Sequence, residues 1–398
     1  MTNPAPAPTP YKRLLSLDVL RGVTIAFMIM VNNNGGPSAW SQMEHAEWNG
    51  LTATDLVFPT FLFVVGASIV FAYQARLARG VTRAQLAWRT AKRACILFLL
   101  GVVVNGFPHF HLAHLRYYGV LQRIAVCYLA VGLFYLFDKR VWTKVAALAL
   151  LLLSYSALVS WVSVPGAGRP GRAIALLDKD QNIVAWLDRQ LMPGHLYEDS
   201  STHNLRDPEG LLSDIPAVGT TLLGLLAGLW LGSQREEKTK ALGLVLASAA
   251  CLASGYFWSI WLPLNKKMWT SSYVLVAAGW SLAVFALVYW AVELKGWGKE
   301  KGKSRSNALA SGALWPWLVF GSNAIAAYMV SELLPGISEL LPFSEDGQKM
   351  DAFGWLHNHL FELLPDPAWA AFAYSLLFTA VCFIPVWILY RNKIFLKV

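Results

Sequence analysis

Long apolar segments alternate with short polar stretches along the whole chain. Most apolar segments are about 20 residues long, the length that an α-helix needs to cross a bilayer core of about 30 Å. Within them apolar residues follow one another without the alternation typical of membrane-spanning strands. The pattern predicts an all-α, polytopic membrane protein with about ten transmembrane helices, over residues 14–33, 51–75, 94–107, 118–137, 141–164, 211–232, 241–262, 270–293, 313–335 and 368–390.

The connections between these segments differ in length. The third apolar segment is short, and we expect its helix to begin earlier, near Trp88. Three connections are long enough to form external loops, over residues 34–50, 165–209 and 336–367. The last loop contains FGWLHNHLFELL, which predicts a helix lying along the membrane interface.

The start of the chain differs from the rest. Residues 1–11 are rich in proline, so we expect a disordered cytoplasmic tail, followed by a single transmembrane domain over residues 12–398. Asp18 and Arg21 interrupt the first apolar segment, and no small-residue cleavage site ends it. This segment is therefore expected to act as an uncleaved signal anchor.

Composition and charge agree with a chain almost entirely embedded in lipid. It is 56% hydrophobic and only 14% charged, with a mean hydropathy of +0.44, which leaves no soluble domain of useful size. The net charge of +9 comes from basic residues that gather in segments expected on one side of the membrane. The positive-inside rule then places both termini in the cytoplasm, so the partner expected is the lipid bilayer and not nucleic acid. All four cysteines lie in predicted helices, so no disulfide framework is expected.

The most informative polar residue is His45, in the stretch between the first two apolar segments. Histidine takes or gives a proton near neutral pH, so His45 is a candidate catalytic base at the membrane surface. Amides precede it, and the candidate site also includes Asn32, Asn33, Asn34, Trp48 and Asn49. Asp55 follows at the start of the second helix. It either favours that helix N-terminus or orients His45, and both interpretations stay open.

Further polar residues fall at the external ends of later helices. They are Gln122, Arg123, Glu209, Asn265 and Lys266, and we predict that they join the pocket around His45. Two of them also have a plainer interpretation. Arg123 could extend along the helix to the interface, and Glu209 could cap a helix. Trp48 could belong to the interfacial aromatic belt or stack on a sugar ring. The lysine pair at 266 and 267 runs against the positive-inside trend, which favours a functional contact.

Three other sets of polar residues stand apart from this group in the sequence. Asp18 and Arg21 are three residues apart and would share a helix face, either as a structural ion pair or at a cofactor site on the cytoplasmic side. Asn323 lies within an apolar helix and needs a hydrogen-bond partner. Three histidines crowd one external loop, at His109, His111 and His114, without a cysteine or carboxylate beside them, so we expect interfacial residues and no metal site.

These residues resemble a known family. RLLSLDVLRGVTIAFMIMVNN and HAEWNGLTATDLVFPTFLFVVGAS look like the transmembrane heparan-alpha-glucosaminide N-acetyltransferase family. The likeness continues in order through GVLQRIAVCY, DPEGLLSDIPAVGTTLLGLLAG, PLNKKMWTSSYVL and LYRNKIFLKV. It covers nearly all of residues 12–398.

The resemblance implies transfer of an acetyl group from cytosolic acetyl-CoA to the amine of glucosamine or a terminal glucosaminide on the external side. His45 matches the family's essential histidine, and Asn32 is assigned to the nearby asparagine, with Asn33 and Asn34 as interchangeable candidates. His45 would act as general base or carry the acetyl group covalently. Arg21 and Asn323 are assigned to acetyl-CoA. A bacterial cytoplasmic (inner) membrane, a periplasmic pocket and a homodimer are further expectations from the resemblance.

Two other functions fit the same composition. An amino-sugar or sugar transporter would also have about ten helices with buried polar residues. A membrane O-acyltransferase of surface polysaccharide would use a hydroxyl acceptor in place of an amine.

Overall fold

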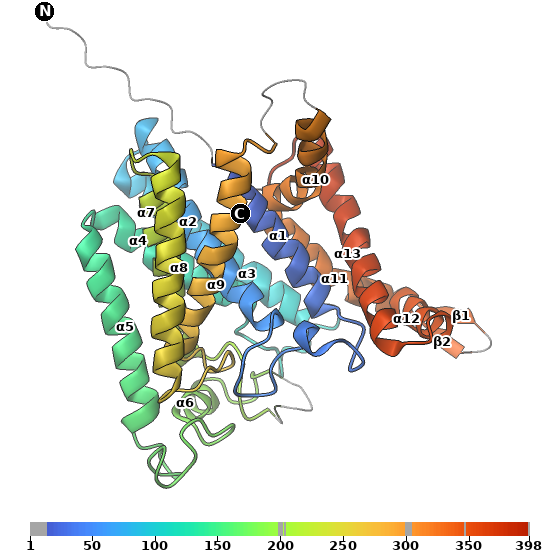
Figure 1. Ribbon diagram of the computed structural model, residues 1–398. Coiled ribbons are helices and arrows are strands. Elements are labelled where there is room, and N and C mark those ends of the chain that lie inside the picture. Colours follow the sequence, from blue (N-terminus) through green and yellow to red (C-terminus); the bar gives the residue numbers. More distant parts are fainter. Residues whose placement is uncertain (1–13, 198–201, 203, 299–304, 346–347, 397–398) are drawn as a thin grey trace, which may run out of the picture.

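The computed structural model describes residues 14–197, 202, 204–298, 305–345 and 348–396 (Figure 1). The disordered tail expected over residues 1–11 lies outside these residues. The described chain is helical apart from loops and one short hairpin, so the all-α prediction is confirmed. The α-helices are α1 Leu15–Asn32, α2 Val57–Ala78, α3 Arg83–Gly106, α4 Val120–Phe137, α5 Val141–Trp161, α6 Ile183–Leu191, α7 Asp214–Leu231, α8 Glu237–Ser259, α9 Ser271–Tyr289, α10 Arg305–Ser322, α11 Ala324–Glu339, α12 Ala352–Leu363 and α13 Pro367–Arg391.

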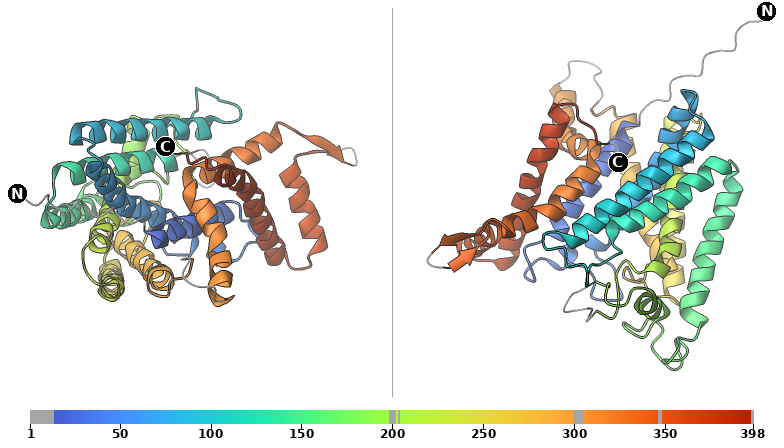
Figure 2. Two further views of the ribbon diagram at one scale, coloured as in Figure 1. Left: turned by 90° about the horizontal axis from the view of Figure 1, so that it is seen from above. Right: turned by 180° about the vertical axis from the view of Figure 1, so that it is seen from behind.

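Several short elements complete the chain. Single turns of 3₁₀-helix are η1 Ser41–Met43, η2 Thr54–Leu56 and η3 Leu211–Ser213, and a π-helical turn, η4 Trp290–Leu294, extends α9. The strands β1 Phe343–Glu345 and β2 Gln348–Met350 pair antiparallel, with Phe343 opposite Met350. This hairpin and α12 extend from the side of the bundle (Figures 1 and 2). A helix within FGWLHNHLFELL is therefore confirmed.

The number of candidate spans comes close to the expected number of about ten. Within the described residues, eight helices are long and apolar enough to cross a membrane, or nine if the bent pair α10 and α11 forms one span. The α3 helix falls short because it begins at Arg83, well before the expected start, and its first half is charged. The helix expected over 313–335 is broken at Asn323, where the two parts meet at an angle of 77°.

Glycines allow the central helices to approach closely. A Cβ atom added to Gly66 of α2 would lie 1.9 Å from the carbonyl oxygen of Thr221 on α7, and one added to Gly224 would lie 1.9 Å from that of Phe63. Gly22 of α1 and Gly321 of α10 make the corresponding contact between their helices. Small residues at such positions let backbones pack together in lipid, where no hydrophobic effect drives helices to associate.

Burial separates central helices from peripheral ones. About two thirds of the apolar window is buried in α1, α2 and the η3–α7 span, against 17% in α8 and 22% in α13. The apolar side chains of α8 and α13 therefore face outward, as expected of helices in contact with lipid.

The loops between helices gather mainly on one face of the bundle. We call this the loop face; it carries residues 33–56 and the segment with α6, on the side away from the first residues of α1 (Figure 1). Trp48, Tyr155 and Val184 belong to one buried apolar cluster there, which attaches the α6 segment to the helix ends. The packing of these apolar side chains thus holds the loops against the end of the helix bundle.

Candidate functional site

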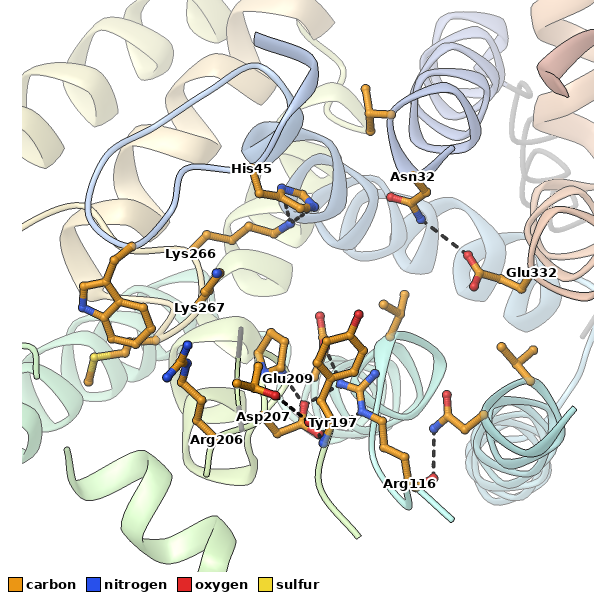
Figure 3. A pocket seen from close by; sticks show the side chains of 18 of the residues that line it. Asn32, His45, Arg116, Tyr197, Arg206, Asp207, Glu209, Lys266, Lys267 and Glu332 are labelled. Carbon is orange, nitrogen blue, oxygen red and sulfur yellow. Dashed lines mark hydrogen bonds and ion pairs between the residues drawn. The ribbon is translucent and has the colours of Figure 1, made fainter. Parts of the chain in front are cut away.

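A cavity of about 560 Å³ opens on the loop face (Figure 3). We call it the polar cavity. Its walls come from the C-terminal ends of α1 and α3, the start of α4, the loops around His45 and Asp207, the turn after α8, and α11. The cavity therefore lies where elements distant in sequence meet.

His45 is held at one wall of the polar cavity by Asp55. The Nδ1 atom of the imidazole lies 2.8 Å from Oδ1 of Asp55, whose side chain is 1% exposed. The other carboxylate oxygen accepts hydrogen bonds from the backbone N–H groups of Ala46 and Thr52, each at 3.1 Å. With an Nδ1–H donating to Asp55, the second ring nitrogen, Nε2, is left to accept a proton. The orienting interpretation of Asp55 thus has direct geometric support.

Lys266 lies against the same imidazole. Its Nζ atom is 3.1 Å from Nδ1 and 3.2 Å from Nε2 of His45, and 4.0 Å from Oδ1 of Asp55. Desolvation lowers the pKa of His45, and the nearby Lys266 lowers it further. Desolvation also lowers the pKa of Lys266. Both effects favour the unprotonated imidazole, which is the form able to act as a base.

All three asparagines at the end of α1 line the cavity, but they differ in their contacts. Asn33 donates to the carbonyl of Ile29, and Asn34 donates to the carbonyl of Met43. Asn32 instead donates to Oε1 of Glu332 on α11, at 3.4 Å (Figure 3). Asn32 is thus the member of the trio that contacts another residue of the cavity.

Two predicted binding residues support the loops and do not line the cavity. The side-chain amide of Asn265 donates to Oδ1 of Asn49 at 3.1 Å, and Oδ1 of Asn265 accepts from the backbone N–H of Met268 at 2.8 Å. These bonds tie the turn carrying Lys266 to the loop carrying His45. The contacts of Asn49 and Asn265 thus give both residues a supporting role in the loops.

Trp48 does line the cavity, although its ring is engaged. The indole N–H donates to the carbonyl of Leu177 at 2.7 Å, and the guanidinium of Arg206 lies 5.5 Å from the ring centroid. The side chain is 8% exposed. This environment favours anchoring of the α6 segment over stacking on a sugar.

Gln122 and Arg123 also lie outside the cavity. Both are fully buried in α4. The guanidinium of Arg123 bonds to Asp214 at 3.1 Å and to the carbonyl of Gly210 at 3.2 Å, behind the cavity wall. The prediction that they line the pocket is therefore wrong, and the extension of Arg123 to the interface is wrong as well. A buried cation with a carboxylate partner on α7 explains the difference.

Glu209 lines the cavity as part of a charged cluster. Arg116 bonds to Asp207 through Nε at 2.8 Å and to Glu209 at 2.6 Å (Figure 3). Burial alone would raise the pKa of Glu209, but Arg116 and Arg123 outweigh it and lower that pKa. Burial would lower the pKa of Arg116, and the two carboxylates raise it instead. Arg116 therefore pairs with both carboxylates, and its charge favours the ionised form of Glu209.

Several residues that line this cavity were not assigned to the site from the sequence, among them Arg116, Tyr197, Asp207 and Glu332. Arg116 is the single basic residue of its external loop, and Asp207 stands two residues before Glu209. Glu332 is a carboxylate within an otherwise apolar helix, which is a signal of function in its own right.

A second cavity, of about 440 Å³, lies toward the opposite face. We call it the basic cavity because its lining includes Arg21, Arg76, Arg79 and Arg93. Arg21 contacts Asp18 at 3.1 Å and the Ser68 hydroxyl at 2.8 Å, so both alternatives for this pair are compatible with its place. Nε of Arg93 is buried and has no hydrogen-bond partner among the described residues.

Asn323 does not line the basic cavity, in contrast to the expectation. It stands at the break between α10 and α11, where its amide donates to the carbonyl of Ile394 and accepts from the N–H of Leu396. The partner that a buried asparagine requires is the backbone after α13.

Ala324 and Ile325 of α11 line the basic cavity, and Tyr328 lines the polar one, so this helix borders both.

His109, His111 and His114 line neither cavity, although Arg116 of the same loop lines the polar one. Nε2 of His109 lies 3.1 Å from Glu339, and the ring of His111 lies beside that of His109. Among the described residues, no group of three or more histidine, cysteine or acidic side chains is arranged to hold a metal ion.

Comparison with known proteins agrees with the resemblance in the residues. Residues 13–173, which include His45, Asp55 and Arg116, match the family described as Heparan-alpha-glucosaminide N-acetyltransferase, catalytic. The heparan-alpha-glucosaminide N-acetyltransferase of Homo sapiens is 28% identical over 442 residues, and that of Mus musculus is 27% identical over 438 residues. Each alignment covers 97% of this chain, which spans 60% of the length of either relative.

Proposed function

We propose that this chain, which is similar to heparan-alpha-glucosaminide N-acetyltransferases along most of its length, is a membrane N-acetyltransferase. It would transfer an acetyl group from acetyl-CoA to the amine of glucosamine or of a terminal glucosaminide. The observation that carries the proposal is the His45–Asp55 pair at the wall of the polar cavity, within the segment that matches the catalytic family.

The chemistry needs a base beside an acceptor amine. Nε2 of His45 would take the proton that the amine loses as it attacks the thioester carbonyl. Asp55 would hold the ring and stabilise the imidazolium that forms. The amide of Asn32 would donate a hydrogen bond to the oxyanion of the tetrahedral intermediate. Attack by His45 itself, giving an acetyl-imidazole, is the second route open to the same atom.

The basic cavity supports acetyl-CoA as the donor. Coenzyme A carries phosphates, and four arginines line this cavity, including Arg93 with its buried, unpartnered Nε. Arg21 and Asn32 are eleven residues apart on α1, or about 16 Å along the helix. The extended arm of coenzyme A would cover this distance and bring the acetyl group to His45.

Sidedness follows from the charge pattern. We place the basic cavity and both termini on the cytoplasmic side, and the polar cavity on the periplasmic side of a bacterial inner membrane. Acetyl-CoA would then enter from the cytosol and the amino sugar from outside. A homodimer is part of the proposal on the resemblance alone.

The deciding experiment uses the full-length chain in liposomes with acetyl-CoA and glucosamine. We expect N-acetylglucosamine to form, and His45→Ala to lower the rate by about 10²–10⁴-fold. The variant should keep the elution profile and thermal midpoint of the parent, because the ring is half exposed. Full activity of folded His45→Ala would overturn the role of His45.

The same assay separates the alternatives. A transporter would move labelled glucosamine without consuming acetyl-CoA. An O-acyltransferase would acetylate a hydroxyl acceptor that has no amine. Mass analysis of the His45 peptide after incubation with acetyl-CoA alone tests the covalent route.

A further inference from the structure

The proposed reaction leaves one proton unaccounted for. At neutral pH an amino sugar is largely an ammonium ion, whose nitrogen carries three protons, and the amide product carries one. Two protons must therefore leave the nitrogen. The first must leave before attack, because the ammonium has no lone pair. The second leaves from the tetrahedral intermediate and can pass through His45 to the departing thiolate of coenzyme A. The first proton needs another acceptor.

Glu332 is a carboxylate in the right place to receive it. It lies on α11, on the wall of the polar cavity opposite the Lys266–His45 wall, and faces Asn32 (Figure 3). Its contact to Asn32 joins Oε1 to the side-chain amide at 3.4 Å. Tyr328, one turn earlier on the same helix, also lines the cavity.

Ion pairing distinguishes Glu332 from Asp207 and Glu209, the other acids of the cavity. Asp207 and Glu209 are both paired with Arg116. Among the described residues, no lysine, arginine or histidine forms an ion pair with Glu332, and its hydrogen-bond donors are neutral. Burying a carboxylate without a cationic partner costs free energy, and binding of a cationic ligand would offset that cost.

The groups around Glu332 come from several elements. Its own helix offers the phenol of Tyr328, and α1 offers the amide of Asn32. Across the cavity, the charges of Arg116 and Glu209 act on the carboxyl group of Glu332 with opposite signs. From α13, the thiol of Cys382 also interacts with Glu332. Within the described part of the chain, Glu332 is thus left without a dedicated counter-ion.

We propose that Glu332 binds the ammonium group of the acceptor and takes its first proton. The N–H bond breaks, an O–H bond forms on the carboxyl group, and the free amine gains the lone pair that attacks the thioester. The carboxyl group then returns this proton to water at the loop face. The inference rests on the proposed function and assigns the acceptor to a class, namely primary amines that are cationic before reaction.

The test compares Glu332→Gln with the parent chain across pH. Loss of a charge-assisted contact should raise the KM for glucosamine about tenfold or more at pH 7, with little change in the KM for acetyl-CoA. The defect should shrink above the pKa of the acceptor amine, where the amine is already neutral. An unchanged KM for glucosamine and an unchanged pH profile would overturn the inference.

Binding without the donor keeps the test independent of catalysis. By calorimetry, the parent should bind glucosamine more tightly than N-acetylglucosamine, and Glu332→Gln should lose that preference. Equal preference in both proteins would count against Glu332. If the parent does not acetylate glucosamine at all, the proposed function fails, and the calorimetry still decides the ammonium site.

Glu339→Gln provides the matched control. It removes the same charge seven residues later on α11, from an exposed side chain that pairs with His109 outside both cavities. We expect its KM values and pH profile to match those of the parent. Elution profile and thermal midpoint check that both variants are folded.

Discussion

Two basic side chains lie within 3.1 Å of each other in the polar cavity, and each disfavours protonation of the other. In the proposed reaction the imidazole of His45 gains from this arrangement, because a general base must be unprotonated to act. Desolvation is the larger cause of its lowered pKa, and the positive charge of Lys266 is the second. Asp55 acts in the opposite direction, toward a protonated ring. The reactivity of His45 therefore reflects a balance among its two charged neighbours and its surroundings.

Replacing Lys266 by methionine should move this balance. The pKa of His45 would rise, so the ring would become protonated at a higher pH and the acidic limb of kcat/KM would shift upward. A shift of one pH unit corresponds to about a tenfold loss of rate on that limb. Rates measured from pH 5 to 9 give the profile.

Lys267→Met is the control for that shift. It removes the same charge from the next residue, whose Nζ atom bonds to the carbonyl of Glu47 and not to the ring. We expect a smaller displacement of the acidic limb. A profile of Lys266→Met that moves to lower pH, or does not move, would contradict the proposed balance.

Sequence reasoning identified residues near the polar cavity, but not all of their side chains line it. His45, Asp55 and Lys266 could be predicted because they fall at helix ends on one face. Asn265 and Arg123 fall at the same ends, yet their side chains turn toward Asn49 and toward Asp214. The direction of a side chain around a helix end depends on partners more than 90 residues away, which local sequence does not reveal.

Helix contacts in the bundle depend on glycines at positions where a neighbouring helix leaves no room for a side chain. Gly66→Ala or Gly224→Ala would force a Cβ atom against a carbonyl oxygen of the neighbouring helix, so α2 and α7 would have to separate. Overpacking of this kind costs about 1–3 kcal/mol. We expect a lower midpoint of thermal unfolding in detergent for either variant.

Gly312→Ala is the control for those variants. It adds the same methyl group in α10, where a Cβ atom would have nothing within 4 Å. We expect its midpoint to equal or exceed that of the parent, because alanine favours helices. Equal midpoints for Gly66→Ala and Gly312→Ala would show that the close contact has no energetic weight.

Element boundaries show where the apolar pattern is sufficient. The bounds of α1, α4, α7 and α13 lie within about three residues of the prediction, because polar or turn residues flank each apolar segment. The break at Asn323 was missed because apolar residues continue on both sides of it. Its cause is a contact with the backbone of Ile394 and Leu396, more than 70 residues later. The charged first half of α3 likewise escapes a search for apolar segments.

The bundle as a whole has two faces with different linings, and the charge pattern predicts which one meets the cytosol. Ser41→Cys on the loop face and Lys238→Cys in α8 provide one exposed probe for each end. In a background without the native cysteines, a membrane-impermeant maleimide should label Ser41→Cys in intact cells. Lys238→Cys should be labelled only after the membrane is opened. The reverse pattern would invert the proposed orientation.

The helix α11 borders both cavities, and this has an electrical consequence. Ile325 and Tyr328 are about one turn apart, or roughly 5 Å along the helix. In the proposed orientation, part of the membrane potential would fall across the protein between the two cavities. Moving one elementary charge across it involves about 2.3 kcal/mol per 100 mV. Coenzyme A gives up the acyl group and gains one proton in exchange, so the transfer moves no net charge, and energised and de-energised membranes should support the same transfer step.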